Sequence, residues 1–375
     1  MPWQERTVEH QRQSFVLAAQ QGDVPMAELC RQHGISRKTG YKWVTRAAAG
    51  EDLADRSRRP HRSPGQTSPA IEAQVLALRD AQPTWGSRKL HHRLVALGVA
   101  EVPAPSTITG ILRRHGQLAP EPPRRDFQRF EHPAPNILWQ MDFKGHWALL
   151  GGGRVFPWDL LDDHSRYALA LRACENQQRQ TVQDQLTTVF QAYGLPDAIL
   201  CDNGSPWGPA GMGGLTTCEV WLLQLGVEPI HGQPFHPQTQ GKIERFHGTL
   251  ARDVAARPPL RTLAEAQAAF DRFRTVYNHE RPHEALGYAT PASCYQPSAR
   301  PFPQALPAVI YDTGVLVRTV TVHGSISWQG GRHFIGRGLV GQPVALEPTD
   351  DPAVWRVIFG TRQVAVIDLR TPDEV

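Results

Sequence analysis

The spacing of apolar positions changes twice along the chain. In the first third, apolar residues recur every three to four positions, which is typical of amphipathic helices. This pattern predicts helices within 26–46, 69–81, 87–97 and 106–115. From about residue 136, alternating strand-like stretches are interleaved with helical ones, and after about residue 301 only short strand-like stretches remain. The pattern therefore predicts an all-α front, an α/β middle and a β-rich end.

Residues 1–50 predict a first helix-turn-helix unit. Gly34 permits the tight turn, and Ser36 is a favourable N-cap for the second helix. Gly40 lies inside that helix, where glycine costs about 1 kcal/mol relative to alanine. A surface helical hairpin without a binding role is the alternative. Basic side chains lie at the start and on the outer side of the second helix, where such units contact bases and phosphates: Arg37, Lys38 and Lys42.

Residues 69–120 predict a second helix-turn-helix unit, for which plain helix packing is the alternative. Ser106 is expected to cap its last helix, and Arg113 and Arg114 close that helix. The segment 51–68 between the two units is rich in Pro, Gly, Ser and Arg, so we expect a linker. Its arginines are free to follow a phosphate backbone: Arg56, Arg58, Arg59 and Arg62.

Two further domains are predicted after the helical ones, and a multidomain protein is expected for a chain of 375 residues. Strands that alternate with helices over 125–296 predict a layered α/β core. Six short strands over 305–375 predict a small β-barrel or sandwich.

Charge and composition narrow the possible partners. Residues 1–135 hold 20 Lys and Arg against 13 Asp and Glu, whereas the net charge of the whole chain is only +4. A basic front third favours a polyanion such as DNA. No stretch approaches the roughly 20 apolar residues that a membrane helix needs, and the first residues lack the apolar region of a signal peptide. Five scattered cysteines without a CxxC pair favour a reducing cytoplasm and argue against a zinc site.

Three carboxylates stand out by their local context. Asp142 lies in an otherwise apolar strand, where a carboxylate is costly unless it is paired or binds a cation. Asp202 ends a short buried strand before a turn, and Glu244 lies in the first turn of a later helix. Separately, Asp142 could be an edge-strand residue with an ion-pair partner, and Asp202 an ordinary turn residue. If the three converge, they form an all-oxygen site suited to two Mg²⁺ or Mn²⁺ ions.

Four motifs carry a resemblance to a known family: WQMDF, LCDNGSPW, HPQTQGKIERFHGTL and YNHERPHEALGYATPASCY. They resemble the retroviral-integrase-type (DDE) core of bacterial insertion-sequence transposases over residues 125–296. The paired helix-turn-helix units are similar to those of the same enzymes. The resemblance implies a ribonuclease-H-like fold, a Mg²⁺- or Mn²⁺-dependent triad of Asp142, Asp202 and Glu244, and a homo-oligomer on double-stranded DNA. It also implies strand cleavage at terminal inverted repeats, followed by attack of the 3′-hydroxyl on target DNA.

The chain departs from this pattern in two places. The 41 residues between Asp202 and Glu244 exceed the usual spacing. Ala251 stands where many relatives carry a lysine that touches the DNA end, so Arg252, or Lys242 and Arg245, would replace it. Two uncharged side chains on the loop before the helix are expected to contact frayed terminal bases: Gln238 and Gln240.

Other residues favour structural roles. We expect Asp163 to cap a turn rather than bind metal, and His231 and His236 to pack in turns rather than contact DNA. The RPH motif (Arg281, Pro282 and His283) is also expected to be structural. The competing functional hypotheses are a DNA-binding regulator, or domesticated remnant, with an inactive core, and a metal nuclease without strand transfer.

Overall fold

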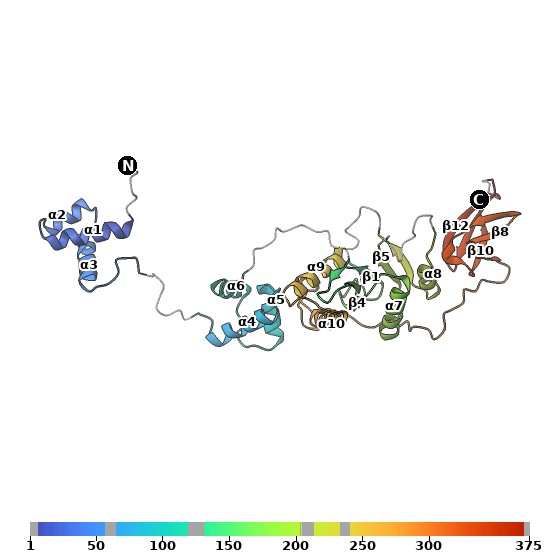
Figure 1. Ribbon diagram of the computed structural model, residues 1–375, viewed down its shortest axis with the longest axis horizontal. Helices are drawn as coiled ribbons and strands as arrows, with labels where there is room; N and C mark the ends of the chain where they lie inside the picture. Colours follow the sequence, from blue (N-terminus) through green and yellow to red (C-terminus); the bar gives the residue numbers. More distant parts are fainter. Residues whose placement is uncertain are drawn as a thin grey trace. The chain divides into compact units, whose positions relative to one another are not determined.

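The computed structural model describes residues 7–56, 65–118, 131–202, 204, 214–232 and 241–370. The chain divides into two compact units, Met1–Gln66 and Thr67–Val375 (Figure 1). The second unit contains the second helical domain, the α/β core and the C-terminal strands. Within the described ranges no helix is both long and apolar enough to cross a membrane.

The first unit consists of three helices: α1 (Val8–Gln21), α2 (Met26–Gln32) and α3 (Arg37–Ala48). The predicted N-cap is confirmed, because the Ser36 side chain accepts a hydrogen bond from the Thr39 amide. A β-carbon on Gly40 would lie 2.6 Å from Cys30 Sγ and 2.9 Å from Phe15 Cζ. Glycine therefore occupies this helical position because α3 packs closely against α1 and α2.

The second unit begins with three helices around a buried core of Val75, Trp85 and Leu90: α4 (Pro69–Ala81), α5 (Ser87–Ala96) and α6 (Pro105–Arg114). The predicted Ser106 cap is wrong. Ala104 occupies the N-cap position without a side-chain hydrogen bond, and Pro105 begins the helix. Proline suits this position because its missing amide would have had no helical partner.

The α/β core is built on a six-stranded mixed sheet with the path β2-β3-β1-β5-β6 and with β4 paired to β3. Strand β1 runs antiparallel to β3 and parallel to β5, which in turn runs parallel to β6. The four predicted strands of the core are present as β1, β3, β4 and β5, whereas β2 and β6 were not predicted. The bounds are β1 (Leu138–Phe143), β2 (Trp147–Ala148), β3 (Arg154–Asp162), β4 (Ala168–Cys174), β5 (Ala198–Cys201) and β6 (Glu228–His231).

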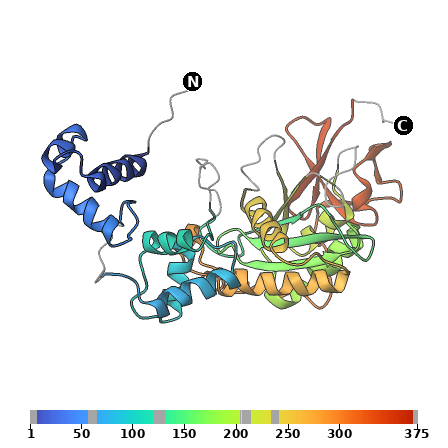
Figure 2. The ribbon, with the colours of Figure 1, turned by 60° about the vertical axis from the view of Figure 1, so that its left-hand side comes forward.

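Helices cover both faces of this sheet. Trp139 and Met141 of β1 pack into a cluster with α7 (Arg179–Tyr193) and α8 (Thr217–Gln224). Residues of β3 and β4 on the other face pack against α9 (Gly241–Ala255) and α10 (Leu263–His279). Figure 2 shows α10, in orange, running along the green sheet. Because side chains alternate along a strand, Gln140 and Asp142 face the side of α9.

The C-terminal strands form a four-stranded antiparallel sheet, β12-β11-β10-β7, and a two-stranded one, β8-β9. All six predicted strands are present. The barrel alternative is not confirmed, because β7 and β12 are the edges of the larger sheet and no closed sheet forms among the described strands. The bounds are β7 (Leu316–Thr319), β8 (Ser325–Trp328), β9 (Gly331–Phe334), β10 (Pro343–Pro348), β11 (Val354–Phe359) and β12 (Arg362–Asp368).

Ion pairs tie the flanking domains of the second unit to the core. On the helical side, Arg93 pairs with Glu280 at 2.7 Å and Arg88 with Glu284 at 3.0 Å. On the C-terminal side, Arg362 of β12 pairs with Glu228 at 2.6 Å. The first two pairs join the second helical domain to the segment that follows α10, which carries the RPH motif.

Candidate functional site

Three adjacent strands place aspartates at the same level of the sheet. In the antiparallel register of β1 and β3, Asp142 lies directly opposite Asp159. In the parallel register of β1 and β5, Gln140 lies opposite Leu200, and Asp142 and Asp202 each follow two residues later. Neighbouring strands lie about 4.8 Å apart. The order β3-β1-β5 therefore gathers three carboxylates that are distant in sequence.

Asp142 lies at the centre of this row. Its Oδ1 accepts a hydrogen bond from the Phe143 amide at 2.7 Å, and its side chain is 21% exposed. Burial, the charge of Asp159 and the charge of Asp202 raise the pKa of Asp142 to about 6, against the opposing charge of His247. The crowding of negative charge around this carboxyl group is relieved either by protonation or by a cation.

Asp202 is held at the end of β5 from two sides. Its Oδ1 accepts a hydrogen bond from the Gly204 amide at 3.0 Å. Its backbone carbonyl accepts one from His231 Nδ1 at 3.0 Å, and His231 Nε2 donates to Glu219 at 2.8 Å. The hydrogen bond to Glu219 raises the pKa of His231. His231 thus links α8 to the end of β5, whereas His236 lies outside the described residues.

A carboxylate–histidine pair, Asp159 and His247, lies beside Asp142, as the pair of Glu219 and His231 lies beside Asp202. His247 of α9 donates through Nε2 to Asp159 Oδ2 at 2.7 Å, and its Nδ1 lies 3.8 Å from Asp142 Oδ2. The side chains of Asp159 and His247 are 1% and 8% exposed. Burial disfavours the imidazolium, but the charge and hydrogen bond of Asp159 outweigh it and raise the pKa of His247.

Glu244 is exposed in the first turn of α9, three residues before His247 and hence on a neighbouring part of the helix surface. Among the described residues, no three His, Cys, Asp or Glu side chains lie close enough together to hold a metal ion. The structure therefore brings Asp142 near Asp202 but does not join Glu244 to them in a preformed three-ligand site.

The two strand aspartates nevertheless fit a divalent cation. Carboxylate oxygens are the ligands that Mg²⁺ and Mn²⁺ prefer. The repulsion that Asp159 and Asp202 exert on Asp142 is the kind of electrostatic cost that a bound cation offsets.

Asp163 does not cap the turn between β3 and β4, so that prediction is wrong. The neighbouring Asp162 does so, because its Oδ1 accepts from the Ser165 amide at 2.7 Å. Asp163 instead accepts from Gln140 Nε2 at 2.8 Å and pairs with Lys242 at 2.5 Å. Since Lys242 is 16% exposed and held by this pair, a contact with a phosphate would require it to leave Asp163.

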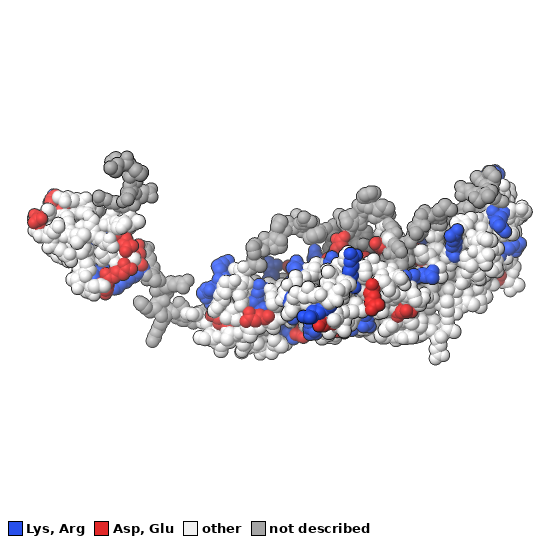
Figure 3. Space-filling model, in the orientation of Figure 1, with Lys and Arg blue, Asp and Glu red and all other residues white. Residues whose placement is uncertain are grey.

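The other predicted DNA contacts are distributed unevenly. Arg37, Lys38 and Lys42 are exposed on α3. Arg113 is exposed, while Arg114 pairs with Glu72 at 3.0 Å, and Arg56 pairs with Glu51. Figure 3 shows blue basic side chains recurring along the visible face of the second unit, interspersed with red acidic ones. Four predicted DNA contacts lie outside the described residues, namely Arg58, Arg59, Gln238 and Gln240. The linker residue Arg62 lies outside them too.

Basic residues converge where α5 meets the α/β core. Lys89 of α5 is half-buried, and burial together with the charges of Arg281, Arg252 and Arg245 lowers the pKa of Lys89 to about 8. Arg245 and Arg252 are exposed on α9. We call these four residues the basic cluster. Lys89 was not predicted, and Arg281 was assigned only a structural role, because their convergence depends on how the second helical domain packs on the core.

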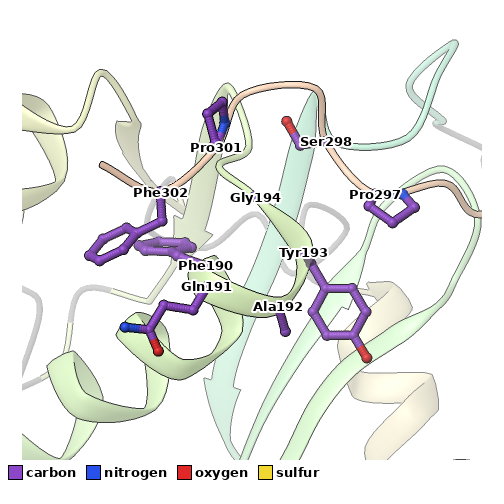
Figure 4. Close-up of a pocket in the computed structure, with 9 residues that line it drawn as sticks. All are labelled: Phe190, Gln191, Ala192, Tyr193, Gly194, Pro297, Ser298, Pro301 and Phe302. Carbon is purple, nitrogen blue, oxygen red and sulfur yellow. The ribbon is translucent and has the colours of Figure 1, made fainter. Parts of the chain in front are cut away.

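The pocket in Figure 4 is separate from the carboxylates. It has a volume of about 310 Å³ and lies between the end of α7 and residues 297–302. Figure 4 shows the rings of Phe190 and Phe302 together at one end and Tyr193 at the other. None of the predicted site residues lines it, so the candidate chemistry lies at the row of aspartates.

The sequence analysis missed Asp159, His247 and Glu219. Asp159 could have been found by the argument that identified Asp142, because it too is a carboxylate within an apolar strand, FPWDLL. His247 follows Glu244 by three residues and therefore lies near it on the helix. Glu219 carried no comparable signal, because its role depends on the packing of α8 beside β6.

Comparison with known families accounts for most of the chain. A family described as "Integrase core domain" matches residues 132–237, and a second of that description matches 225–291. A "Helix-turn-helix domain" matches 11–61 and a "Homeodomain-like domain" matches 39–112. The family "IS481 family transposase, C-terminal domain" matches 315–374.

Individual relatives are more distant. The chain is 28% identical over 159 residues to an uncharacterized protein of insertion element IS407 from Burkholderia multivorans, covering 42% of this chain and 55% of the relative. It is 24% identical over 233 residues to an uncharacterized protein of insertion element IS476 from Xanthomonas euvesicatoria, covering 61% of this chain and 65% of the relative. The chain thus spans less than two thirds of each of these relatives.

A solved structure of the HTLV-2 integrase catalytic core in complex with magnesium matches with a TM-score of 0.34 and 14% identity, over 43% of this chain and 97% of that one. This similarity is too low to support an inference. The family matches are stronger, since two helix-turn-helix matches, two integrase-core matches and a transposase C-terminal match follow one another along the sequence. Along its length the chain therefore matches helix-turn-helix, integrase-core and IS481-family transposase C-terminal domain models in that order, and the two relatives named above are proteins of insertion elements.

Proposed function

We propose that this protein binds the terminal inverted repeats of an insertion element and catalyses metal-dependent cleavage and transfer of the DNA strands. Asp142, Asp202 and Glu244 are the proposed catalytic residues and metal ligands. The observation that carries the proposal is the row of carboxylates across β3, β1 and β5, in which burial and the charges of Asp159 and Asp202 raise the pKa of Asp142. A cluster of this kind in a chain that matches integrase-core models is best explained as a cation site.

Two divalent ions bound at this site would activate the attacking oxygen and stabilise the leaving oxygen of a phosphodiester. The protein has to hold its carboxylates deprotonated and to position the DNA, because alignment and charge neutralisation supply most of the rate of such a displacement. Asp142 and Asp202 are positioned by rigid strands. Glu244 completes the site only if α9 and the sheet edge approach each other more closely when DNA and metal bind.

The basic cluster is the proposed contact for the DNA end. Burial and the charges of Arg281, Arg252 and Arg245 lower the pKa of Lys89, and a phosphate between these cations would replace their repulsion of Lys89 by attraction. Arg245 and Arg252 belong to the helix that carries Glu244, so a phosphate held there lies beside the proposed active site. This arrangement supplies cations in place of the lysine that is missing at Ala251.

The remaining exposed cations suit the recognition of duplex DNA. Arg37, Lys38 and Lys42 lie along the second helix of a helix-turn-helix unit, the element that enters the major groove. We assign sequence recognition to this unit and to the second one, and end positioning to the basic cluster. Because two ends must be processed together, we propose that the protein acts as a homo-oligomer on DNA.

A supercoiled plasmid that carries both ends of the element tests the proposal. The full-length protein with Mn²⁺ is expected to cleave at the ends and to form joined products, and Asp142→Asn is expected to abolish both reactions while DNA binding persists. Cleavage without joined products would indicate a metal nuclease instead.

A DNA-binding regulator with an inactive core is the second candidate. It is favoured by the separation of Glu244 from the other two carboxylates and by Ala251. Specific binding to the element ends without Mn²⁺-dependent cleavage would support it and contradict the proposed enzyme.

A further inference from the structure

His247 is placed between two carboxylates that face each other across neighbouring strands. Asp142 and Asp159 are directly opposed in the β1–β3 register, an arrangement that is destabilising when both are charged. The imidazole of His247 enters from α9 and contacts both, at 2.7 Å to Asp159 Oδ2 and 3.8 Å to Asp142 Oδ2. The ring therefore bridges the sheet and the helix that carries Glu244.

The side chain of Asp159 interacts mainly with the imidazole of His247. It is 1% exposed, and its Oδ1 has no hydrogen-bond partner in the described structure. A buried carboxylate is costly unless it is paired, and the pairing of Asp159 is with His247. The 2.7 Å hydrogen bond fixes one nitrogen of the ring, and the other, Nδ1, lies 3.8 Å from Asp142 Oδ2.

Asp142 is hydrogen-bonded at one carboxylate oxygen and lies beside His247 at the other. Oδ1 accepts from the Phe143 amide at 2.7 Å, and Oδ2 faces His247 Nδ1. Without the ring, the second oxygen would lose its neighbour and the carboxylate could rotate about its terminal bond. Metal ligands are commonly oriented by such contacts, and loss of an orienting group typically weakens metal binding about 10–100-fold.

We propose that Asp159 and His247 are positioning residues. Asp159 orients the imidazole of His247, and His247 holds the carboxylate of Asp142 in the geometry needed for a divalent cation. This inference rests on the proposed function, in which Asp142 is a metal ligand. Asp159 does not bind the cation itself and acts on Asp142 through His247.

The affinity of the full-length protein for Mn²⁺, measured without DNA by electron paramagnetic resonance of the free ion, tests this role. His247→Asn shortens the side chain so that it no longer bridges the two carboxylates, and is expected to weaken Mn²⁺ binding about 10–100-fold. Asp159→Asn is expected to weaken it less, because an amide still accepts the hydrogen bond of the ring. The double variant is expected to match His247→Asn within about twofold, because residues that act in one chain of contacts are not additive.

Asp253→Asn is the matched control, since Asp253 is a buried carboxylate on the same helix that pairs with Arg257 at 3.0 Å. It is expected to bind Mn²⁺ like the wild type, even if it melts at a lower temperature. Should His247→Asn fail to fold, His247→Gln replaces it: its single amide nitrogen can still donate to Asp159 but leaves no second nitrogen beside Asp142, so the same weakening is expected.

The outcomes separate this inference from the proposed function. If the wild type binds Mn²⁺ and the His247 variant binds it equally well, the positioning role is refuted and the proposed function stands. Independent, additive losses from the two single variants would also refute it, because Asp159 would then not act through His247. A wild type that binds no Mn²⁺, either alone or with a duplex of the element end, contradicts the proposed function and the positioning role together.

Discussion

Replacing Asp142 by asparagine is expected to stabilise the metal-free protein while abolishing its activity. The pKa of Asp142 is raised from 3.8 to about 6, so the folded protein disfavours the ionised form that prevails near pH 7.5. A shift of one pH unit corresponds to about 1.4 kcal/mol. The ionised carboxylate therefore destabilises the folded state by at most about 3 kcal/mol, and we expect a gain of about 1–3 kcal/mol from the neutral variant.

The sign of the pH dependence follows from the same shift. Because the folded state binds this proton more tightly than the unfolded chain, the destabilisation grows as pH rises from about 4 to about 6 and is absent below about 4. Asparagine keeps the acceptor for the Phe143 amide, which bonds to Asp142 Oδ1. The advantage of Asp142→Asn over the wild type should therefore be full at neutral pH and vanish in acid.

Urea unfolding of both full-length proteins in the presence of EDTA, at several pH values between about 4 and 7.5, measures this difference. The transition of the core is followed separately from that of the first unit. Saturating Mn²⁺ should then stabilise the wild type and leave Asp142→Asn unchanged. An asparagine variant that is equally stable or less stable at neutral pH would refute the view that burial and neighbouring negative charge disfavour an ionised Asp142.

Three further predictions concern other parts of the chain. Lys89→Gln should weaken binding of a duplex element end a few-fold in a fluorescence anisotropy titration. It should also lower the slope of log affinity against log salt concentration by about 1, as expected for one lost phosphate contact. An unchanged slope would show that Lys89 does not contact a phosphate as part of the basic cluster. Gly40→Ala should destabilise the first unit by about 1–3 kcal/mol in urea unfolding, because its β-carbon would overlap Cys30 and Phe15; a stability gain would show that α3 is not packed so closely. Glu219→Gln should lower the pKa of His231 in an NMR titration. Because the folded pKa of His231 is raised, the variant should lose stability most at acidic pH, and the loss should fade as pH rises through that pKa, so a pH-independent effect would contradict the pairing.

Local patterns were sufficient to predict most secondary structure. Apolar patterning identified β1, β3, β4 and β5 but not the short β2 and β6, and the Ser36 cap marked the start of α3. The prediction at Ser106 failed because the neighbouring Pro105 begins the helix without needing a cap. The barrel alternative was not supported because closure depends on pairing between edge strands, which a strand's own sequence does not specify.

The proposed site was predictable only in part. Asp142 stood out because an apolar strand makes a carboxylate conspicuous, and Asp202 because a turn follows it. That Asp159 faces Asp142 depends on the register of β1 and β3, and that His247 bridges them depends on the packing of α9. Such contacts between elements distant in sequence are fixed by tertiary structure. The same holds for Lys89, whose pKa is lowered by burial and by the charge of Arg281 because the second helical domain packs beside the core.

Crystals of the full-length protein with Mn²⁺ and a duplex of its element end would test the central claim most directly, through the anomalous scattering of the metal. The account predicts two metal peaks, each about 2.1 Å from carboxylate oxygens of Asp142, Asp202 or Glu244, with Glu244 drawn toward the two strand aspartates. Density for Mn²⁺ elsewhere only, or a bound DNA end with no metal beside Asp142 and Asp202, would contradict it.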